Sequence, residues 1–568
     1  MNKLLIHANN TSFTDDNYFL KSEQFEFIVP SSEIDIDFYI SDELESGILR
    51  EKLLKADICF VKVFLTQNYL EAVGLRIAYH IRLTSSLGCK THLPIILVAE
   101  DDIQYLGKVL SLPFILFTEG IYVSNEDRLS FDKILSRSKD GKLKGLNDFD
   151  SFLRRITIPP PAGYQSHHSV ANEWSILRWS RALGIKESGS VLKVKEKIES
   201  LLYYKYLLAS FPVTNIDKLN LGFRVAEKGN ILLIDDEWSS GWSAIMKEFL
   251  TGSPNLYNGF SACEFVFSNL TDSQIIENCL AMVRSANPDI IILDLRLSDS
   301  DFKKMALVTD FTGYKILKSV KKINPGIRVV VFTASNKAWN ILELQSLGAD
   351  GFIFKEFPDF NQGAESIISI KRLAATLREQ LKYRFQKELF NKYTRVEADL
   401  SAQSSGDEGE YLNFIETLQS QLAVIRASIA LIDINKAETI DMAFLSCYNF
   451  LELFRNYYLR QSDSGYRYVL GIDELRLDRY QIKRNKLENI GEFFPEYKNE
   501  SPGWFHVQAA LSIDYFKFST RPYSEVLQLR RLADSRNDYI HSDKLHFQIE
   551  ELESITSLID KMCKYIRE

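Results

Sequence analysis

The sequence lacks the features that mark secreted and membrane proteins. Its six cysteines are scattered without a C-x-x-C pair, so neither a zinc site nor a disulfide framework is indicated, and we expect buried, reduced thiols. No window approaches the roughly 18 consecutive apolar residues of a membrane helix. The apolar stretch at the start is also too short for a secretory signal. We therefore expect a cytoplasmic protein that makes no membrane contact.

An excess of positive charge is also missing. Lys and Arg total 68 against 76 Asp and Glu, and the net charge of -8 confines any nucleic-acid site to a local patch. Hydrophobic residues make up 45% and charged residues 25% of the chain, a balance that excludes a long disordered or collagen-like protein. At roughly 100–200 residues per domain, 568 residues predict three to five folded units.

Patterns along the chain divide it into five segments. Short apolar runs alternate with amphipathic stretches in residues 1–158 and again in 229–372, which predicts two α/β doubly wound domains with parallel sheets covered on both faces. Residues 159–228 start with three prolines and predict a helical connector. Residues 373–410 predict a long helix followed by a flexible linker. Residues 411–568 have almost no strand-like run and predict an all-α bundle.

Five polar residues follow four apolar strands of the second α/β domain. They are Asp235 and Asp236 after ILLI, Asp294 after DIIIL, Thr333 after VVVF and Lys355 after FIF. Because the carboxyl ends of parallel strands meet in one crevice, we expect three carboxylates, a hydroxyl and an ammonium to lie together. Carboxylates so close repel one another, and a hard divalent cation such as Mg²⁺ relieves that repulsion. The array suits phosphoryl transfer onto a carboxylate.

With this set of residues, the segment 229–372 resembles the receiver domain of two-component response regulators. The hallmark of that family is an acidic pair, a phospho-accepting Asp, a Thr or Ser, and a Lys at successive strand ends. The resemblance implies that Asp294 accepts a phosphoryl group from a histidine kinase or phosphotransfer protein. It also implies that Thr333 and Lys355 sense the phosphorylated state.

The same resemblance implies a magnesium site. Asp236, Asp294 and the main-chain carbonyl of Arg296 would hold Mg²⁺, and Asp235 would assist through a water molecule. The stretch 297–313 is longer than the usual loop of the family and predicts a lid or a partner contact. Two alternatives stay open: a flavodoxin-like domain with incidental acidic loop residues, and an intact receiver that is not phosphorylated in vivo.

The first α/β domain has similar strand spacing but different residues at the strand ends. HANN, at residues 7–10, stands where an acidic pair would follow LLI, and Lys62 follows ADICFV in place of an Asp. This domain resembles a pseudo-receiver without the metal-binding carboxylates. The resemblance implies a role in docking or dimerisation.

Two adjacent histidines follow the three prolines. His167 and His168 open a predicted helix, and Asn172 lies four residues beyond His168 on the same face. One interpretation is a phosphorelay histidine on an exposed helix, and the other is capping and packing around Trp174 and Trp179. No glycine-rich phosphate loop accompanies them, so we expect the kinase to be another protein.

The last segment carries Arg536, Asn537 and His541 within one predicted helix. Asn537 and His541 are four residues apart and share a face, and the long side chain of Arg536 can reach round to them. Histidine titrates near neutrality and can move a proton from an RNA 2′-hydroxyl or to the 5′-oxygen. Arginine can stabilise the charge on the pentacoordinate phosphorus, so no metal is needed.

In this motif and its helical setting, residues 411–568 resemble the HEPN superfamily, whose R-x4–6-H motif defines many metal-independent ribonucleases. The family builds its active site from two protomers, so the resemblance implies a homodimer that cleaves RNA without a cofactor. Arg536 and His541 carry over as catalytic residues, with Asn537 as their polar neighbour. The alternative is a catalytically dead HEPN fold that serves dimerisation.

A short basic run precedes that motif. RYQIKRNK spans residues 479–486 and contributes four cations, namely Arg479, Lys483, Arg484 and Lys486. They could grip phosphates at the edge of the groove, although a solvated helix face is the commoner meaning of such a run.

Together these patterns predict a sensor upstream of an effector. Phosphorylation of Asp294 would shift a receiver equilibrium, and the helix from about residue 365 to 400 would carry that shift to a dimeric HEPN ribonuclease. The toxicity of an uncontrolled ribonuclease suggests a stress or anti-phage pathway. The alternative is a non-enzymatic adaptor that binds partner proteins. A DNA-binding output is less favoured, because no helix-turn-helix pattern follows the receiver.

Overall fold

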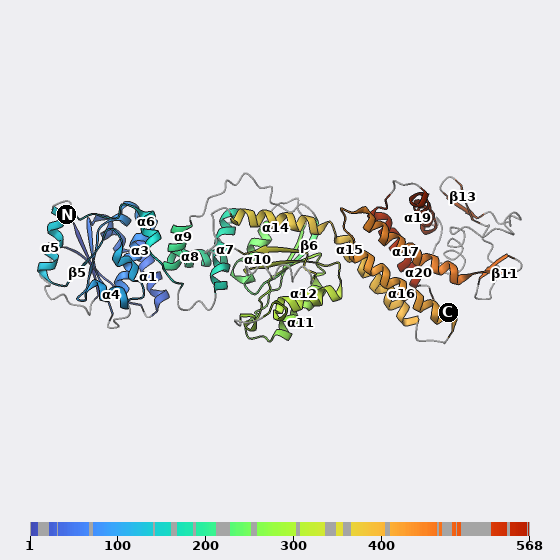
Figure 1. Ribbon diagram of the computed structural model, residues 1–568, viewed down its shortest axis with the longest axis horizontal. Coiled ribbons are helices and arrows are strands. Elements are labelled where there is room, and N and C mark those ends of the chain that lie inside the picture. Colours follow the sequence, from blue (N-terminus) through green and yellow to red (C-terminus); the bar gives the residue numbers. More distant parts are fainter. Residues whose placement is uncertain are drawn as a thin grey trace.

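The chain folds into three units that follow one another along its long axis, with the termini at opposite ends (Figure 1). An α/β unit lies at the N-terminal end, a second α/β unit in the middle and a mainly helical unit at the C-terminal end. This computed structural model describes residues 2–8, 22–30, 32–66, 72–139, 143–160, 167–185, 189–211, 228–251, 258–302, 307–334, 348–355, 365–403, 409–462, 465–468, 480–483, 486–489, 524–541, 546–564 and 566.

The N-terminal unit is built on a five-stranded parallel sheet with the order β2-β1-β3-β4-β5, that of flavodoxin-like folds. Its strands are β1 (Lys3–His7), β2 (Glu23–Glu26), β3 (Ile58–Lys62), β4 (Ile95–Val98) and β5 (Ile121–Ser124). Its helices are α1 (Glu33–Glu45), α2 (Ile48–Lys55), α3 (Val73–Leu83), α4 (Ile103–Val109), α5 (Arg128–Lys139) and α6 (Phe149–Arg155). Every residue of β4 is buried, as expected for a parallel strand covered on both faces.

Three connector helices join the two α/β units. They are α7 (His167–Leu183), α8 (Ser190–Ser200) and α9 (Leu202–Ser210). The amide of Leu202, the first residue of α9, donates to Asp37 Oδ2 on α1 over 2.9 Å. The ammonium of Lys205 on α9 donates to Thr84 Oγ1 at the end of α3 over 2.9 Å. These buried contacts fix α9 on the N-terminal unit.

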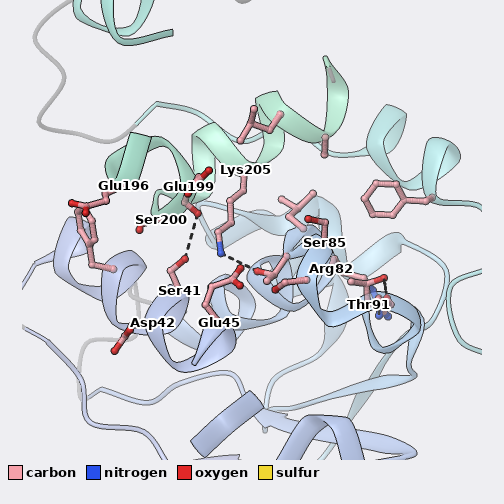
Figure 2. Close-up of a pocket in the computed structure, with 18 of the residues that line it drawn as sticks. Ser41, Asp42, Glu45, Arg82, Ser85, Thr91, Glu196, Glu199, Ser200 and Lys205 are labelled. Carbon is pink, nitrogen blue, oxygen red and sulfur yellow. Dashed lines mark hydrogen bonds between the residues drawn. The ribbon is translucent and has the colours of Figure 1, made fainter. Parts of the chain in front are cut away.

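A cavity of about 1310 Å³ opens along this junction (Figure 2). Ser41 of α1 donates across it to the carbonyl oxygen of Glu199 on α8, over 3.4 Å. Burial lowers the pKa of Lys205 in its wall to about 8, although the carboxylate of Glu45 acts in the opposite direction. The cavity belongs to the N-terminal unit and the connector, not to the strand ends of the second unit.

The middle unit repeats the architecture of the first. Its parallel sheet has the order β10-β9-β8-β6-β7. The strands are β6 (Gly229–Ile234), β7 (Asn258–Ala262), β8 (Ile290–Leu293), β9 (Arg328–Thr333) and β10 (Gly351–Phe354). The helices are α10 (Trp242–Thr251), α11 (Asp272–Ala286), α12 (Thr312–Ile323) and α14 (Glu365–Leu381). The two sheets fit the receiver-type, flavodoxin-like architecture that the sequence predicts.

The C-terminal unit is helical, but it is not purely α. Its helices are α15 (Arg384–Gln403), α16 (Glu410–Ala430), α17 (Ala437–Tyr458), α19 (Ser524–His541) and α20 (Ile549–Lys564). Two antiparallel hairpins accompany them: β11 (Leu459–Ser462) with β12 (Gly465–Tyr468), and β13 (Tyr480–Lys483) with β14 (Lys486–Asn489). The expectation of an all-α unit is therefore corrected, because these strands are short and carry no apolar run that would reveal them.

The long helix expected from residue 365 to 400 is two helices. α14 ends at Leu381 and α15 begins at Arg384, with a turn at Lys382 and Tyr383 between them. Apolar spacing continues across the turn, so the sequence alone does not reveal it. The apolar faces of α14 and α15 belong to different cores, which makes this turn the structural boundary between the receiver-like unit and the helical unit.

One hydrophobic core runs from the N-terminal unit through the connector to the middle unit. It joins Leu97 of β4, Trp174 of α7 and Val330 of β9 in a single cluster. A second cluster covers the other face of the middle sheet, and a third lies inside the C-terminal unit. None of the six cysteines forms a disulfide, and five of them are buried, while Cys89 is exposed. Among the described residues, no helix is both long and apolar enough to span a membrane.

Candidate functional site

The five polar residues predicted to converge do so at the carboxyl ends of four neighbouring strands. Asp235 and Asp236 directly follow β6, and Asp294 directly follows β8. Thr333 is the last residue of β9, and Lys355 directly follows β10. Since β6, β8, β9 and β10 are adjacent in the sheet, these residues form one acidic pocket, in which Asp236 is half-buried and the other four are buried.

Lys355 holds two of the carboxylates of this pocket. Its Nζ donates to Asp294 Oδ2 over 2.5 Å and to Asp235 Oδ2 over 2.9 Å. All three side chains are almost completely buried. Burial disfavours the ammonium, but the two carboxylates outweigh that effect and raise the pKa of Lys355. The pocket therefore holds a cation fixed against the candidate phospho-acceptor.

The three carboxylates of the pocket together carry more negative charge than the single ammonium of Lys355 can neutralise. Burial, and then the neighbouring carboxylates Asp235 and Asp294, raise the pKa of Asp236 well above its ordinary value. Burial likewise raises the pKa of Asp235 to about 6, although Lys355 opposes the shift. These shifts show that the pocket disfavours three ionised carboxylates without a further cation.

The donor set fits a hard divalent cation. One ligand atom each from Asp235, Asp236 and Asp294 lies within 4.8 Å of the others. Carboxylate oxygens at this spacing are typical ligands of Mg²⁺. Arg296, whose carbonyl is a predicted ligand, lies two residues after Asp294, and its guanidinium turns to the ring of Phe311, 5.0 Å from the centroid. The guanidinium of Arg296 therefore contacts an aromatic ring, and only the main-chain carbonyl of this residue is a candidate metal ligand.

Within the described residues, one buried carboxylate ties together the two ends of the long stretch after Asp294. Asp301 accepts hydrogen bonds from the amides of Leu297 (2.9 Å) and Thr312 (3.0 Å), and it is 2% exposed. Gly313 follows Thr312 and lies so close to the pocket that a Cβ there would stand 2.3 Å from the carbonyl oxygen of Asp294. A larger residue at this position would therefore clash with the main chain at Asp294. The sequence analysis missed Asp301, and its place among other acidic residues in LSDSDF gives no signal that distinguishes it.

An aromatic cluster lies beside Lys355 and reaches the connector. The Lys355 Nζ lies 5.1 Å from the ring centroid of Phe332 and 5.5 Å from that of Trp242. Trp179 of α7 packs edge to face on Phe332 at 5.6 Å. The indole of Trp242 donates to Asn172 Oδ1, also on α7, over 3.2 Å. The sequence analysis did not connect these residues with the pocket.

Most of α7 is packed inside the molecule, in contrast to the exposed helix of the phosphorelay interpretation. Between residues 170 and 180 all side chains except Glu173 are buried, including Trp174 and Trp179. This agrees with the packing interpretation of the segment. His167 and His168 are the first two residues of α7, and their side chains lie outside the described part of the chain.

Arg536, Asn537 and His541 lie in one helix, α19, as predicted. The Arg536 guanidinium lies over the ring of Tyr448 on α17, 5.3 Å from the centroid, and its Nη2 is 3.9 Å from Glu452 Oε1. Arg536 also donates to Asn537 Oδ1 over 3.3 Å. Asn537 and His541 are exposed. Five positions correspond to about 140° around a helix, so Arg536 and His541 do not share a face of α19.

The basic run at 479–486 does not form a helix face. Residues Tyr480–Lys483 and Lys486–Asn489 pair as the antiparallel strands of one hairpin, with Lys483 opposite Lys486. The interpretation as a solvated helix is corrected accordingly. Arg479 and Arg484 lie outside the described residues.

Comparison with protein families identifies both α/β units and supports a role in phosphorylation-regulated signalling. Residues 267–367 match the response regulator receiver domain, and residues 7–124 match the inactive receiver domain. The first match contains Asp294, Thr333 and Lys355, while Asp235 and Asp236 precede it. The chain thus carries one receiver and one inactive receiver. Receiver domains commonly bind Mg²⁺ and interact with histidine kinases or phosphotransfer proteins.

Solved structures of single receiver domains are similar to part of the chain. The signal receiver domain of a Luxo repressor protein from Vibrio parahaemolyticus is 22% identical, covering 28% of this chain and 96% of its own, with a TM-score of 0.20. The Mn²⁺-bound response regulator Rcp1 is 21% identical, covering 27% and 95%, with a TM-score of 0.19. Similarities of this size are not informative about function. No curated protein matches the chain.

Proposed function

We propose that this protein is a phosphorelay response regulator whose receiver accepts a phosphoryl group on Asp294 and gates a HEPN-type, metal-independent endoribonuclease. The observation that carries the receiver half is the buried contact between Lys355 and Asp294 beside two further carboxylates. A histidine kinase or phosphotransfer protein would be the donor. The pathway would be one in which cleavage of RNA must be held in check, such as a stress or anti-phage response.

At the receiver, the carboxylate of Asp294 would attack phosphorus as the bond from phosphorus to the donor histidine breaks. Asp236, Asp294 and the carbonyl of Arg296 would hold Mg²⁺, with Asp235 assisting through water, and the ion would neutralise charge on the phosphoryl oxygens. Lys355 would transfer its hydrogen bond from Asp294 to a phosphoryl oxygen, and Thr333 would donate to another.

This exchange of partners gives the receiver its two states. The Lys355 ammonium lies beside the rings of Phe332 and Trp242. Its movement would therefore change the packing of the aromatic cluster on the α7 side of the sheet. α14 packs against β8, β9, β10 and α7, and it leads to the C-terminal unit. We propose that α14 transmits the change to α15.

The C-terminal unit docks at the opposite end of the receiver sheet, before the strands begin. Lys387 of α15 donates to Asp289 Oδ1 and to the carbonyl of Asn287, each over 2.8 Å. Asn324 Nδ2 donates to the Lys387 carbonyl over 3.1 Å, and the Arg328 guanidinium bonds Gln386. These polar contacts support a coupling that spans the whole receiver.

In the C-terminal unit, His541 would move the proton of the RNA 2′-hydroxyl, and Arg536 would stabilise the charge on phosphorus. Asn537, hydrogen-bonded to Arg536, would orient it. Because Arg536 and His541 face different sides of α19, a groove between two protomers would bring Arg536 of each together with His541 of the other. RNA would be the substrate and a homodimer the active form.

The test is cleavage of 5′-labelled tRNA by the full-length protein. We expect cleavage in EDTA, a rate that changes when Mg²⁺ is supplemented with beryllofluoride, and no such change in Asp294→Asn. His541→Ala and Arg536→Ala should reduce the rate by about 10²-fold or more. Arg530→Ala is the matched control, because Arg530 lies on the same helix and pairs with Asp534. Equal inertness of the wild type and His541→Ala would contradict the ribonuclease.

A non-enzymatic adaptor is the second candidate, and one observation favours it. The Arg536 guanidinium is engaged by Tyr448 and Glu452 of α17, as a structural arginine would be. An adaptor predicts that Arg536→Ala loosens the contact of α19 with α17 and that His541→Ala changes nothing in the cell. The ribonuclease predicts that His541→Ala abolishes the phenotype with the fold intact.

A further inference from the structure

The two receiver sheets can be aligned residue by residue, because their hydrogen-bond registers are the same. In the N-terminal sheet one row of Cα partners runs from β1 to β5 through Ile6, Val61, Leu97 and Val123. In the middle sheet the corresponding row runs from β6 to β10 through Ile234, Leu293, Val331 and Phe352. Counting forward from these rows gives the equivalent positions at the strand ends.

At two equivalent positions the two sheets carry residues of opposite charge. One residue beyond the row, Lys62 of the N-terminal sheet stands where Asp294 stands in the middle sheet. Three residues beyond it, Glu126 stands where Lys355 stands. The phospho-acceptor position therefore holds an ammonium, and the position of the sensing lysine holds a carboxylate.

These two residues make the same contact with reversed polarity. Lys62 Nζ donates to Glu126 Oε1 over 2.8 Å, and Lys355 Nζ donates to Asp294 Oδ2 over 2.5 Å. The side chains of Lys62 and Glu126 are 13% and 7% exposed, so solvent screens the pair little. The bridge between the third and fifth strands is kept, although both residues that form it differ.

We propose that the Lys62–Glu126 pair is a permanent substitute for the receiver switch and fixes the N-terminal receiver in one state. In the middle unit the anionic partner, Asp294, is the group that a phosphoryl donor can modify. In the N-terminal unit the anion, Glu126, follows the fifth strand instead, and the acceptor position carries an ammonium. An ammonium repels divalent cations and has no free electron pair with which to attack phosphorus. No input can then draw Lys62 away from Glu126.

A fixed state suits what the N-terminal unit contacts. Asp37 holds the first amide of α9, and Ser41 bonds the end of α8. α8 packs on α7, which in turn packs on α10 and α14 of the active receiver. The inactive receiver thus gives α7 a constant platform, and the moving parts are confined to the middle unit.

Amide hydrogen exchange of the full-length protein tests this inference. Lys62→Met and Glu126→Gln should each speed exchange in β3 and β5 by about tenfold or more, since each removes one partner of this largely buried ion pair. The reversed pair Lys62→Glu with Glu126→Lys should restore protection to within about threefold of the wild type. Arg128→Met, which removes an exposed pair with Asp132 in the same domain, should leave exchange unchanged.

A second variant tests the sign of the charge. Lys62→Asp places a carboxylate opposite Glu126, so protection of β3 and β5 should become dependent on Mg²⁺, while the wild type should show no such dependence. The middle receiver is silenced in both by Asp236→Asn with Asp294→Asn. Unchanged exchange in the single variants, or no effect of Mg²⁺ on Lys62→Asp, would overturn the proposal. Neither result depends on phosphorylation or on RNA cleavage.

Discussion

At the scale of single residues, buried charges decide how the units hold together. Asp37 on α1 accepts from His80 Nε2 over 2.8 Å, from Arg76 and from the Leu202 amide that begins α9. Burial lowers the pKa of His80 from its ordinary value of 6.5 to about 4, although Asp37 acts in the opposite direction. His80 is therefore neutral in the folded protein and donates to an ionised Asp37.

This burial predicts a pH-dependent stability. The unfolded chain takes up a proton on His80 below about pH 6.5, whereas the folded chain does so only near pH 4. The contribution of neutral His80 to the free energy of unfolding should be fully present above pH 6.5. It should fall by up to roughly 3 kcal/mol as the pH drops toward 4. Arg76 and Lys205 also face this group and oppose its protonation.

Urea unfolding of the full-length protein between pH 7.5 and 5 measures that slope. The wild type should lose stability over this range, and His80→Gln, which keeps a donor but has no proton to gain, should lose markedly less. A slope that is the same in both proteins would mean that other groups dominate the pH dependence. The circular dichroism of the two proteins at pH 7.5 should match before the slopes are compared.

At the scale of elements, α7 connects the inactive receiver with the acidic pocket of the middle unit. Its Asn172 accepts from the indole of Trp242, and the Trp242 ring lies beside Lys355. Both side chains are buried. A connector helix thus bonds a residue whose ring lies 5.5 Å from the Lys355 ammonium.

Asn172→Leu should destabilise the middle unit by about 1–3 kcal/mol, because it leaves the Trp242 indole without its acceptor. Trp242→Phe in the same chain removes that unpaired donor, so the double variant should recover part of the loss. Thermal unfolding of the four proteins in a double-mutant cycle gives the coupling. Additive effects would show that the hydrogen bond has no energetic role.

Sequence patterns reveal the elements and the pocket because each of them is local. Apolar strands mark the sheets, and Asp294 or Lys355 directly follows such a strand, so position along the chain is enough to find it. Glu126 is different, because its partner Lys62 is 64 residues away and only the sheet register makes them equivalent to the receiver pair. The turn at Lys382 is hidden for a related reason, since apolar spacing continues across it while the partners of the two helices change.

At the scale of the whole molecule, the receiver is attached to its two neighbours in different ways. It shares a hydrophobic core with the N-terminal unit and the connector, but it meets the C-terminal unit through polar contacts. In that polar interface Lys387 and Asp289 form a largely buried ion pair, with side chains 3% and 15% exposed. The interface that would transmit a signal is thus made of hydrogen bonds and an ion pair, and it belongs to neither hydrophobic core.

Lys387→Met should weaken this joint by about 3–5 kcal/mol, because Asp289 keeps its charge and loses its partner. We expect a larger maximum dimension in small-angle X-ray scattering and a loss of the beryllofluoride effect on the C-terminal unit. Lys382→Met is the matched control, since Lys382 lies five residues earlier and pairs with Glu379 at the surface. An unchanged scattering profile for Lys387→Met would show that other contacts hold the joint.

The shared core makes this receiver a poor candidate for transplantation. Cutting the chain at the connector would uncover Trp179 and Trp242, which pack edge to face at 5.5 Å across the boundary between α7 and α10. A receiver excised at residue 229 would present that aromatic surface to water and aggregate. The helical unit has a separate core, so it could be exchanged for another domain during evolution. The two α/β units share a core and would have to be inherited together.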